Sequence, residues 1–179
     1  AGGNVIHTFT SSGYLTPIVL VTNSLRFRSS ASAYLNRTPT VASNRKTWTW
    51  SAWVKRGAIG SGVNGNLFQG GTTKPDTGST SLSFAVDKLY VQGYSTNWII
   101  TNAVYRDPSA WYHVVLAMDT TQATATNRLK LYVNGSEVSY GTYNNLTQNT
   151  DYGINQAASH VIGQSIASFG GGYFDGYMT

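Results

Sequence analysis

The sequence predicts an all-β protein built as a two-sheet antiparallel sandwich, and three observations support this fold class. The chain is rich in Thr, Ser, Gly and Asn, and only 11% of its residues are charged. This mixture disfavours long surface helices and favours strands joined by polar turns. Runs in which apolar and polar residues alternate recur along the chain. No helix-length segments separate these runs, which indicates antiparallel pairing.

Residues 1–21 are predicted to form an N-terminal β-hairpin arm that precedes a sandwich domain over residues 22–179. Two strand-like runs, 4–10 and 14–21, flank a turn of hairpin length that contains Gly13. Pro17 lacks the amide hydrogen that a central strand would use, so it favours a strand end or a sheet edge. A lone two-stranded hairpin is marginally stable in water, so we expect the arm to pack against the main domain or another chain.

Within the sandwich, strands are predicted wherever apolar side chains alternate with polar ones. These strands cover residues 24–28, 48–54, 81–87, 89–91, 111–118, 128–133, 136–140, 160–162 and 173–178. The run 111–118 is apolar on both faces, which favours a central position. Asn134-Gly135 predicts a tight hairpin turn, because both residues tolerate a positive φ. Glycine-rich 57–71 and 170–172, and polar 143–156, are expected to be loops.

The last predicted strand begins near Tyr173 and reaches the final residue, Thr179. An unfinished strand would leave a sheet edge unpaired, which proteins normally avoid. We therefore expect the sandwich to be truncated at its last strand, as part of a longer polypeptide, or to be completed by another chain.

Composition excludes several classes of protein. The chain has no cysteine, and therefore no disulfide framework, thiol nucleophile or thiolate metal site. No apolar run approaches the ~18 residues of a membrane-spanning helix, so no membrane insertion is expected. The net charge of +5 arises from few acids rather than many bases. Without a dense basic stripe or a recognisable module, nucleic acid is not an expected partner.

Catalytic residues are not predicted. Glycan hydrolases need two carboxylates about 5–10 Å apart. Here Glu137 is the sole glutamate, and Asp87 and Asp119 are each predicted at a strand end without a second acid beside them. The three histidines have no partners at metal-ligand spacing, so no metal site is predicted. The expectation is a protein without enzymatic activity and without a cofactor.

Calcium is kept as an alternative. Asp76, Asp151 and Asp175 are predicted to lie in loops beside Asn or Thr, which is suitable oxygen chemistry for Ca²⁺. The favoured interpretation is that these aspartates form turns.

Several segments, in this order, resemble the laminin-G-like, concanavalin-A-like jelly roll. They are Ser24–Phe27, Tyr34-Leu35, Trp48–Arg56, Trp111–Val115 with Asp119, Leu131–Gly135, Val161–Gly163 and Phe174–Met178. More narrowly, the chain resembles such domains in tail-fibre and other virion proteins of marine bacteriophages. Residues 2–13 resemble the closing strands of the glycine-rich segments that precede them. The resemblance implies a location at the virion surface, with other virion chains, in a homo-oligomer, and host-surface glycans as partners.

Loop aromatics are the candidate glycan-binding residues: Tyr94, Trp98, Tyr143 and Tyr152. Sugars stack their C–H faces on such rings while amide side chains bond the hydroxyls. The alternative is that these rings pack loops onto the sandwich. Among strand tryptophans, Trp111 is interpreted as core and Trp53 as exposed.

Three functions follow from these observations. The first is a non-enzymatic phage surface module, in a tail fibre or similar appendage, that contacts host glycans. The alternative is a structural protein that decorates a capsid or tail through β contacts between chains. A polysaccharide-degrading enzyme is the least favoured.

Overall fold

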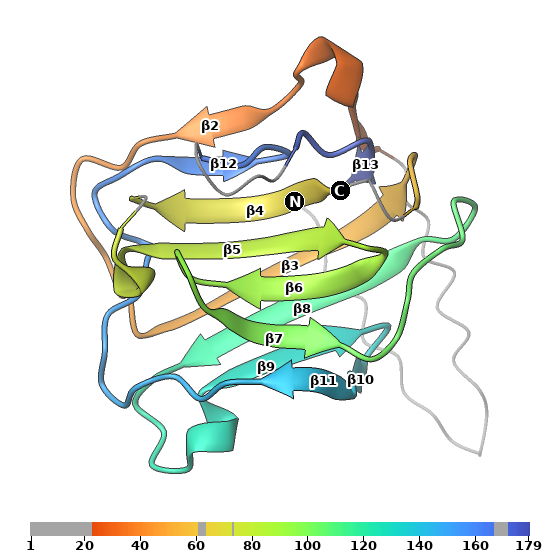
Figure 1. Cartoon of the computed structure of the whole chain (residues 1–179). Helices are drawn as coiled ribbons and strands as arrows, with labels where there is room; N and C mark the ends of the chain where they lie inside the picture. The colour runs from red at the N-terminus through yellow and green to blue at the C-terminus, as the bar shows by residue number, and fades with distance from the viewer. Residues whose placement is uncertain (1–22, 61–63, 73, 167–171) are drawn as a thin grey trace, which may run out of the picture.

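The computed structural model describes residues 23–60, 64–72, 74–166 and 172–179, which form two facing antiparallel sheets (Figure 1). The predicted fold class is confirmed. Sheet A has the strand order β1-β13-β3-β8-β9-β10, and sheet B has the order β11-β7-β6-β5-β4-β12-β2. The predicted arm, residues 1–21, lies outside the described residues.

The strand bounds are as follows. Sheet A contains β1 (Leu25–Phe27), β3 (Thr47–Arg56), β8 (Tyr112–Asp119), β9 (Leu129–Val133), β10 (Ser136–Glu137) and β13 (Gly176–Met178). Sheet B contains β2 (Leu35–Arg37), β4 (Gly65–Gly71), β5 (Ser79–Ala85), β6 (Lys88–Gln92), β7 (Asn97–Thr101), β11 (Tyr140–Tyr143) and β12 (His160–Ile162). Short 3₁₀ turns cover Ser29–Ala31, Asp76–Gly78 and Ala125–Asn127.

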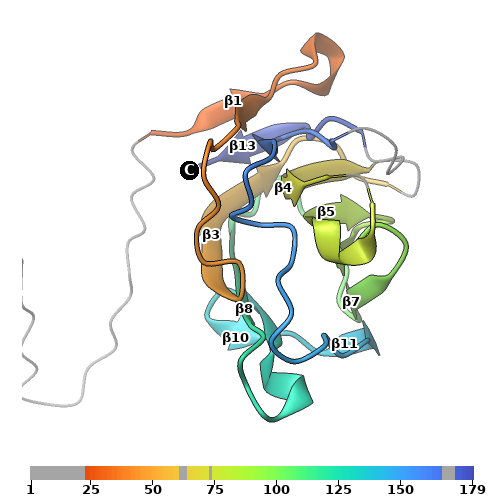
Figure 2. The same cartoon turned by 90° about the vertical axis from the view of Figure 1, so that its left-hand side faces the viewer.

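The core lies between the sheets and follows the two-residue period of the strands. In β5, Leu82 and Phe84 are buried, and in β8 so are Val114, Leu116 and Met118. Successive side chains on a strand point to opposite faces, so these residues interdigitate between the layers seen edge-on in Figure 2. As predicted, β8 is central, because it pairs with β3 on one side and β9 on the other.

Turn chemistry explains two of the hairpins. Asn134 and Gly135 adopt φ values of 52° and 82° between β9 and β10, which confirms the predicted turn. Val86 and Asp87 also have positive φ, 49° and 62°, between β5 and β6. The alternation predicted that Val86 and Asp87 continue the strand 81–87, and this part of the prediction is wrong, although a β-branched residue rarely adopts a positive φ.

The prediction of a loop over 57–71 is wrong in part, because β4 occupies Gly65–Gly71 and pairs with β5 and β12. Its glycines allow close packing within the sheet: a Cβ on Gly70 would lie 2.5 Å from the His160 ring. Strand β7 was not predicted, because it directly follows a turn-rich stretch. Strand β11 extends to Tyr143, the first residue of the predicted loop 143–156.

Candidate functional site

Two of the four predicted glycan-binding rings are buried. Trp98 and Tyr152 are each 4% exposed and pack edge to face, with their ring centroids 5.0 Å apart. The Tyr152 hydroxyl accepts a hydrogen bond from the Thr147 amide at 3.1 Å. The prediction that these rings line an exposed rim is therefore corrected: they pack the loops onto the sandwich, as the alternative interpretation held.

The other two rings lie nearer the surface. Tyr143 is half-buried on β11, and its hydroxyl lies 2.9 Å from the carbonyl oxygen of Leu129, which ties β11 of sheet B to β9 of sheet A. Tyr94 is half-buried in the turn between β6 and β7, and the Lys74 ammonium lies 5.1 Å from its ring centroid. Of the four predicted residues, Tyr94 is the one whose ring lies beside a cationic side chain.

A larger aromatic surface lies on the outward face of sheet A. We call it the aromatic patch and define it as Trp53, Trp111, His113 and Tyr177. Trp53 on β3 stacks on His113 on β8, with ring centroids 4.9 Å apart. Trp111 lies beside Tyr177 on β13 at 6.4 Å. Tyr177 is 38% exposed, and the other three side chains are half-buried.

Strand alternation places this patch. Trp53 faces away from the buried Val54, and Tyr177 faces away from the buried Met178, so both rings lie on the outer face. Trp53 was predicted to be exposed; it does face outward, but its ring is half-buried against His113. The interpretation of Trp111 as core is corrected, because it lies half-buried against Tyr177 just before β8 begins.

Two cationic side chains border the aromatic patch. The Arg26 guanidinium lies 4.9 Å from the Tyr177 ring centroid and is bonded to the Asp175 carboxylate at 2.8 Å. Lys55 lies directly across the β3–β13 pair from Tyr177. The patch therefore combines flat apolar rings with cationic and polar side chains on strands that are held by backbone ladders on both sides.

The shifted carboxyl groups are all held in the ionised form. Hydrogen bonds lower the pKa of Asp119 through Gln122 and Thr121. Burial alone would raise the pKa of Glu137, but the hydrogen bonds from Lys130 and Tyr140 and the charge of Lys130 together lower it. Those two donors lie 3.0 and 2.8 Å from the Glu137 Oε1 atom.

Among the described residues, Asp87 is the one carboxylate that is both deeply buried and part of an ion pair. It accepts a hydrogen bond from the Gly60 amide at 2.8 Å and pairs with Arg56 at 2.9 Å and Arg106 at 2.8 Å. The Gly60 amide lowers its pKa most, burial opposes this, and the two arginines lower it further, to about 2. The arrangement fastens the turn after β5 to β3 and to the segment after Tyr105.

Of the three aspartates considered as calcium ligands, two accept hydrogen bonds from protein groups and the third lies in an exposed loop. Asp76 accepts hydrogen bonds from Ser95 and Thr96, and Asp175 accepts from Arg26 and Ser29. Asp151 is exposed in the loop after β11. Over the described ranges, no group of three or more His, Cys, Asp or Glu could hold a metal ion. In that same part of the chain, no helix is long and apolar enough to cross a membrane.

Comparisons with known proteins agree on the architecture. The family described as "Concanavalin A-like lectin/glucanases superfamily" matches residues 28–179. The solved structure of the mouse laminin α1 chain, domains LG4-5, is similar with a TM-score of 0.59 and 14% identity. The match covers 99% of this chain and 44% of that one, so this chain spans less than half of the laminin structure.

A second similar solved structure is the Ruminococcus gnavus IT-sialidase CBM40 bound to α2,3 sialyllactose. Its TM-score is 0.51 at 15% identity, and the match covers 78% of this chain and 74% of that one. At these identities the likeness concerns the fold. No curated protein matches the sequence.

Proposed function

This chain belongs to the concanavalin A-like lectin/glucanases superfamily, and on that premise we propose that it is a non-enzymatic module that contacts host-surface glycans. We place it on the surface of a bacteriophage particle, in a tail fibre or similar appendage, beside other chains of the virion. The aromatic patch is the contact surface.

The observation that carries this proposal is the exposed Tyr177 ring beside Trp111 on the outward face of sheet A. Sugar rings present apolar C–H faces, and a flat aromatic ring on a rigid strand contacts such a face at a low cost in side-chain entropy. Lys55 supplies donors for sugar hydroxyl or carboxylate oxygens, while Arg26 contributes positive charge, since its terminal nitrogens already donate to Asp175 and to backbone carbonyls.

The carboxyl chemistry favours binding over hydrolysis. A glycosidase needs a general acid whose pKa is raised, so that the acid keeps its proton near neutral pH. Every carboxyl group with a shifted pKa among the described residues is shifted downward: Asp76, Asp87, Asp107, Asp119, Glu137 and Asp175. Incubation of the purified protein with polysaccharides should therefore yield no shortened products.

The test compares two tyrosines that each lie beside a cation: Tyr177 on β13 of sheet A, and Tyr94 in the turn between β6 and β7 of sheet B. Tyr177→Ala removes the exposed ring of the patch, and Tyr94→Ala removes the ring beside Lys74. We expect Tyr177→Ala to weaken binding to an array of bacterial surface polysaccharides, with α2,3-sialyllactose included, by about tenfold. Tyr94→Ala should leave binding unchanged.

Both variants should keep the melting temperature of the parent chain within a few degrees, since neither ring is fully buried. If Tyr94→Ala reduced binding and Tyr177→Ala did not, the glycan surface would be the rim of sheet B. Binding that is unchanged in both variants would contradict both locations.

A further inference from the structure

The dipeptide Asn-Gly occurs twice in this chain, and the structure places the two copies in different surroundings. Both copies, Asn64-Gly65 and Asn134-Gly135, follow a valine, so the local sequence hardly distinguishes them. Asn64 is exposed, but Gly65 is buried as the first residue of β4 and is paired with β5. A Cβ on Gly65 would lie 3.1 Å from the Phe174 side chain, so this glycine is closely covered.

The second copy forms the turn between β9 and β10, where both residues are exposed. A Cβ on Gly135 would meet nothing within 4 Å, so the peptide bond between the two residues is open to water. Among the described residues, no group accepts a hydrogen bond from the Gly135 amide or from the Asn134 Nδ2 group. The Gly135 nitrogen therefore has no protein partner to give up when it reacts.

The side-chain carbonyl of Asn134 is held by the neighbouring strand. The backbone N–H of His113 on β8 donates to Asn134 Oδ1 at 2.8 Å, and the Asn134 backbone N–H donates to the His113 carbonyl oxygen at 2.8 Å. The side chain thus takes the place that a backbone carbonyl would have if the β8–β9 ladder continued. A fixed N–H donor draws electron density from the Asn134 Cγ atom and stabilises negative charge that develops on Oδ1.

We propose that Asn134-Gly135 is a site of spontaneous deamidation in the folded protein, and that the fold protects Asn64-Gly65. A solvent base takes the proton from the Gly135 nitrogen, which attacks Asn134 Cγ while charge develops on Oδ1 beside the His113 N–H. Nδ2 takes up a proton from solvent and leaves as ammonia, which completes a five-membered succinimide ring. Water then adds to one of the two ring carbonyls and opens the ring to aspartate or isoaspartate.

Ring closure changes the backbone at the glycine, because the glycine nitrogen becomes part of the succinimide ring. Gly135 lies in a two-residue turn in which both residues have positive φ, and glycine tolerates a wide range of φ and ψ there. At Gly65 the same change would disturb the pairing of β4 with β5 and move the backbone against Phe174. Reaction at Asn64 therefore requires local opening of the sheet, which suppresses it.

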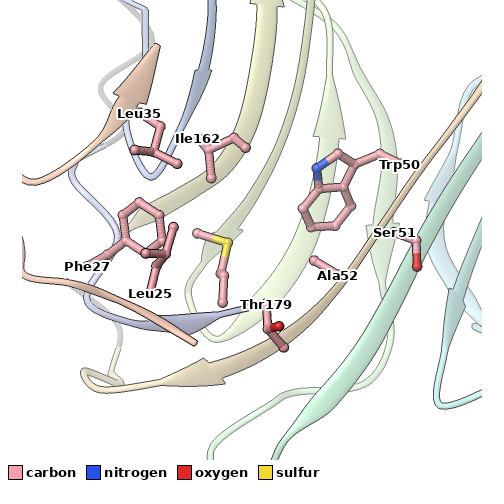
Figure 3. A pocket seen from close by; sticks show the side chains of 9 residues that line it. Leu25, Phe27, Leu35, Trp50, Ser51, Ala52, Ile162 and Thr179 are labelled. Carbon is pink, nitrogen blue, oxygen red and sulfur yellow. The ribbon is translucent and has the colours of Figure 1, made fainter. Parts of the chain in front are cut away.

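The modification changes the surroundings of the aromatic patch. His113 belongs to that patch, and its Nε2 atom lies 2.9 Å from the Ser51 Oγ atom on the outward face of sheet A. Figure 3 shows the Ser51 and Trp50 side chains leaving β3 in different directions, as strand alternation requires. Deamidation adds one negative charge next to this face and lowers the net charge of the chain from +5 to +4. In isoaspartate the main chain runs through the former side chain, so the acceptor of the His113 N–H is displaced.

The experiment incubates the full chain in ¹⁸O-labelled water at mildly alkaline pH, once folded and once unfolded in guanidinium chloride. Peptide mass spectrometry then measures label uptake at each Asn-Gly, and electron-transfer fragmentation distinguishes aspartate from isoaspartate. In the folded chain we expect Asn134 to convert at least about tenfold faster than Asn64. In denaturant the two rates should agree within about twofold, because the fold no longer separates the sites.

Two matched variants test the assignment on the folded chain by cation-exchange chromatography, which resolves the form with one positive charge less. Asn134→Gln removes the reaction at the exposed turn, because a glutamine side chain would have to close a larger ring. Asn64→Gln makes the same change at the protected copy. We expect the acidic form to accumulate in Asn64→Gln as in the parent chain, and to be strongly reduced in Asn134→Gln.

Three results would overturn the proposal. Equal rates at Asn64 and Asn134 in the folded chain would show that the sheet gives no protection. A rate at Asn134 that falls more than about tenfold below its rate in denaturant would show that the turn itself protects the amide. An acidic form that accumulates unchanged in Asn134→Gln would place the reaction elsewhere. None of these measurements involves glycan binding, so they do not depend on the proposed function.

Discussion

Replacement of Asp87 by Asn tests whether the buried ion pair holds the turn after β5. The carboxylate and the Arg56 guanidinium are each 2% exposed, and they lie 2.9 Å apart. One nitrogen of Arg56, Nη2, has no hydrogen-bond partner, and the guanidinium lies 4.6 Å from the Phe84 ring centroid. Loss of the carboxylate charge would leave a buried cation without its anion.

The magnitude follows from two estimates. Breaking a buried pair by removing one partner costs about 3–5 kcal/mol of unfolding free energy. The pKa of Asp87, which the Gly60 amide above all lowers from 3.8 to about 2, corresponds to about 2 kcal/mol. Because the folded-state pKa lies below the unfolded one, this second contribution is present above about pH 4 and is lost as the pH falls through 2.

The assay is urea unfolding of the parent and of Asp87→Asn between pH 7 and pH 2. We expect the variant to be less stable by at least about 3 kcal/mol at pH 7, and the difference to shrink by about 2 kcal/mol by pH 2. Asp119→Asn is the control, because that hydrogen-bonded carboxylate is partly exposed and its loss should cost less than about 1 kcal/mol. A difference between parent and Asp87→Asn that stays constant with pH would refute the reasoning.

Two further predictions concern packing. Trp98→Ala should lower the unfolding free energy by about 3–5 kcal/mol, seen as a lower melting temperature, because the ring is buried against Tyr152. An unchanged melting temperature with lost glycan binding would instead return Trp98 to the glycan surface. Gly163→Ala should destabilise more than Gly135→Ala in denaturant titrations. Both have φ near +83°, but a Cβ on Gly163 would lie 2.4 Å from the Phe27 ring, whereas one on Gly135 meets nothing within 4 Å. Equal losses would show that the ring moves aside.

Local alternation predicts most strands of this fold, because one face of each strand must be buried. Strand β5 illustrates this, since Leu82 and Phe84 are in the core, but the alternation fails at Val86, which is 47% exposed in the turn that follows. Strand β4 was not predicted, because a segment with several glycines is typical of a loop. In the structure these glycines are needed because His160 and Phe174 approach the β4 backbone closely. Sequence spacing does not reveal which neighbour will approach a backbone.

The binding surfaces were harder to predict, since they depend on which strands pair. Trp98 follows a polar turn, and its burial is set by Tyr152, which comes from a distant loop. Arg26 and Tyr177 meet because the first and last described strands of sheet A are neighbours. The alternation around Trp53 did signal an outward ring, but the partners that turn it into a patch come from β8 and β13.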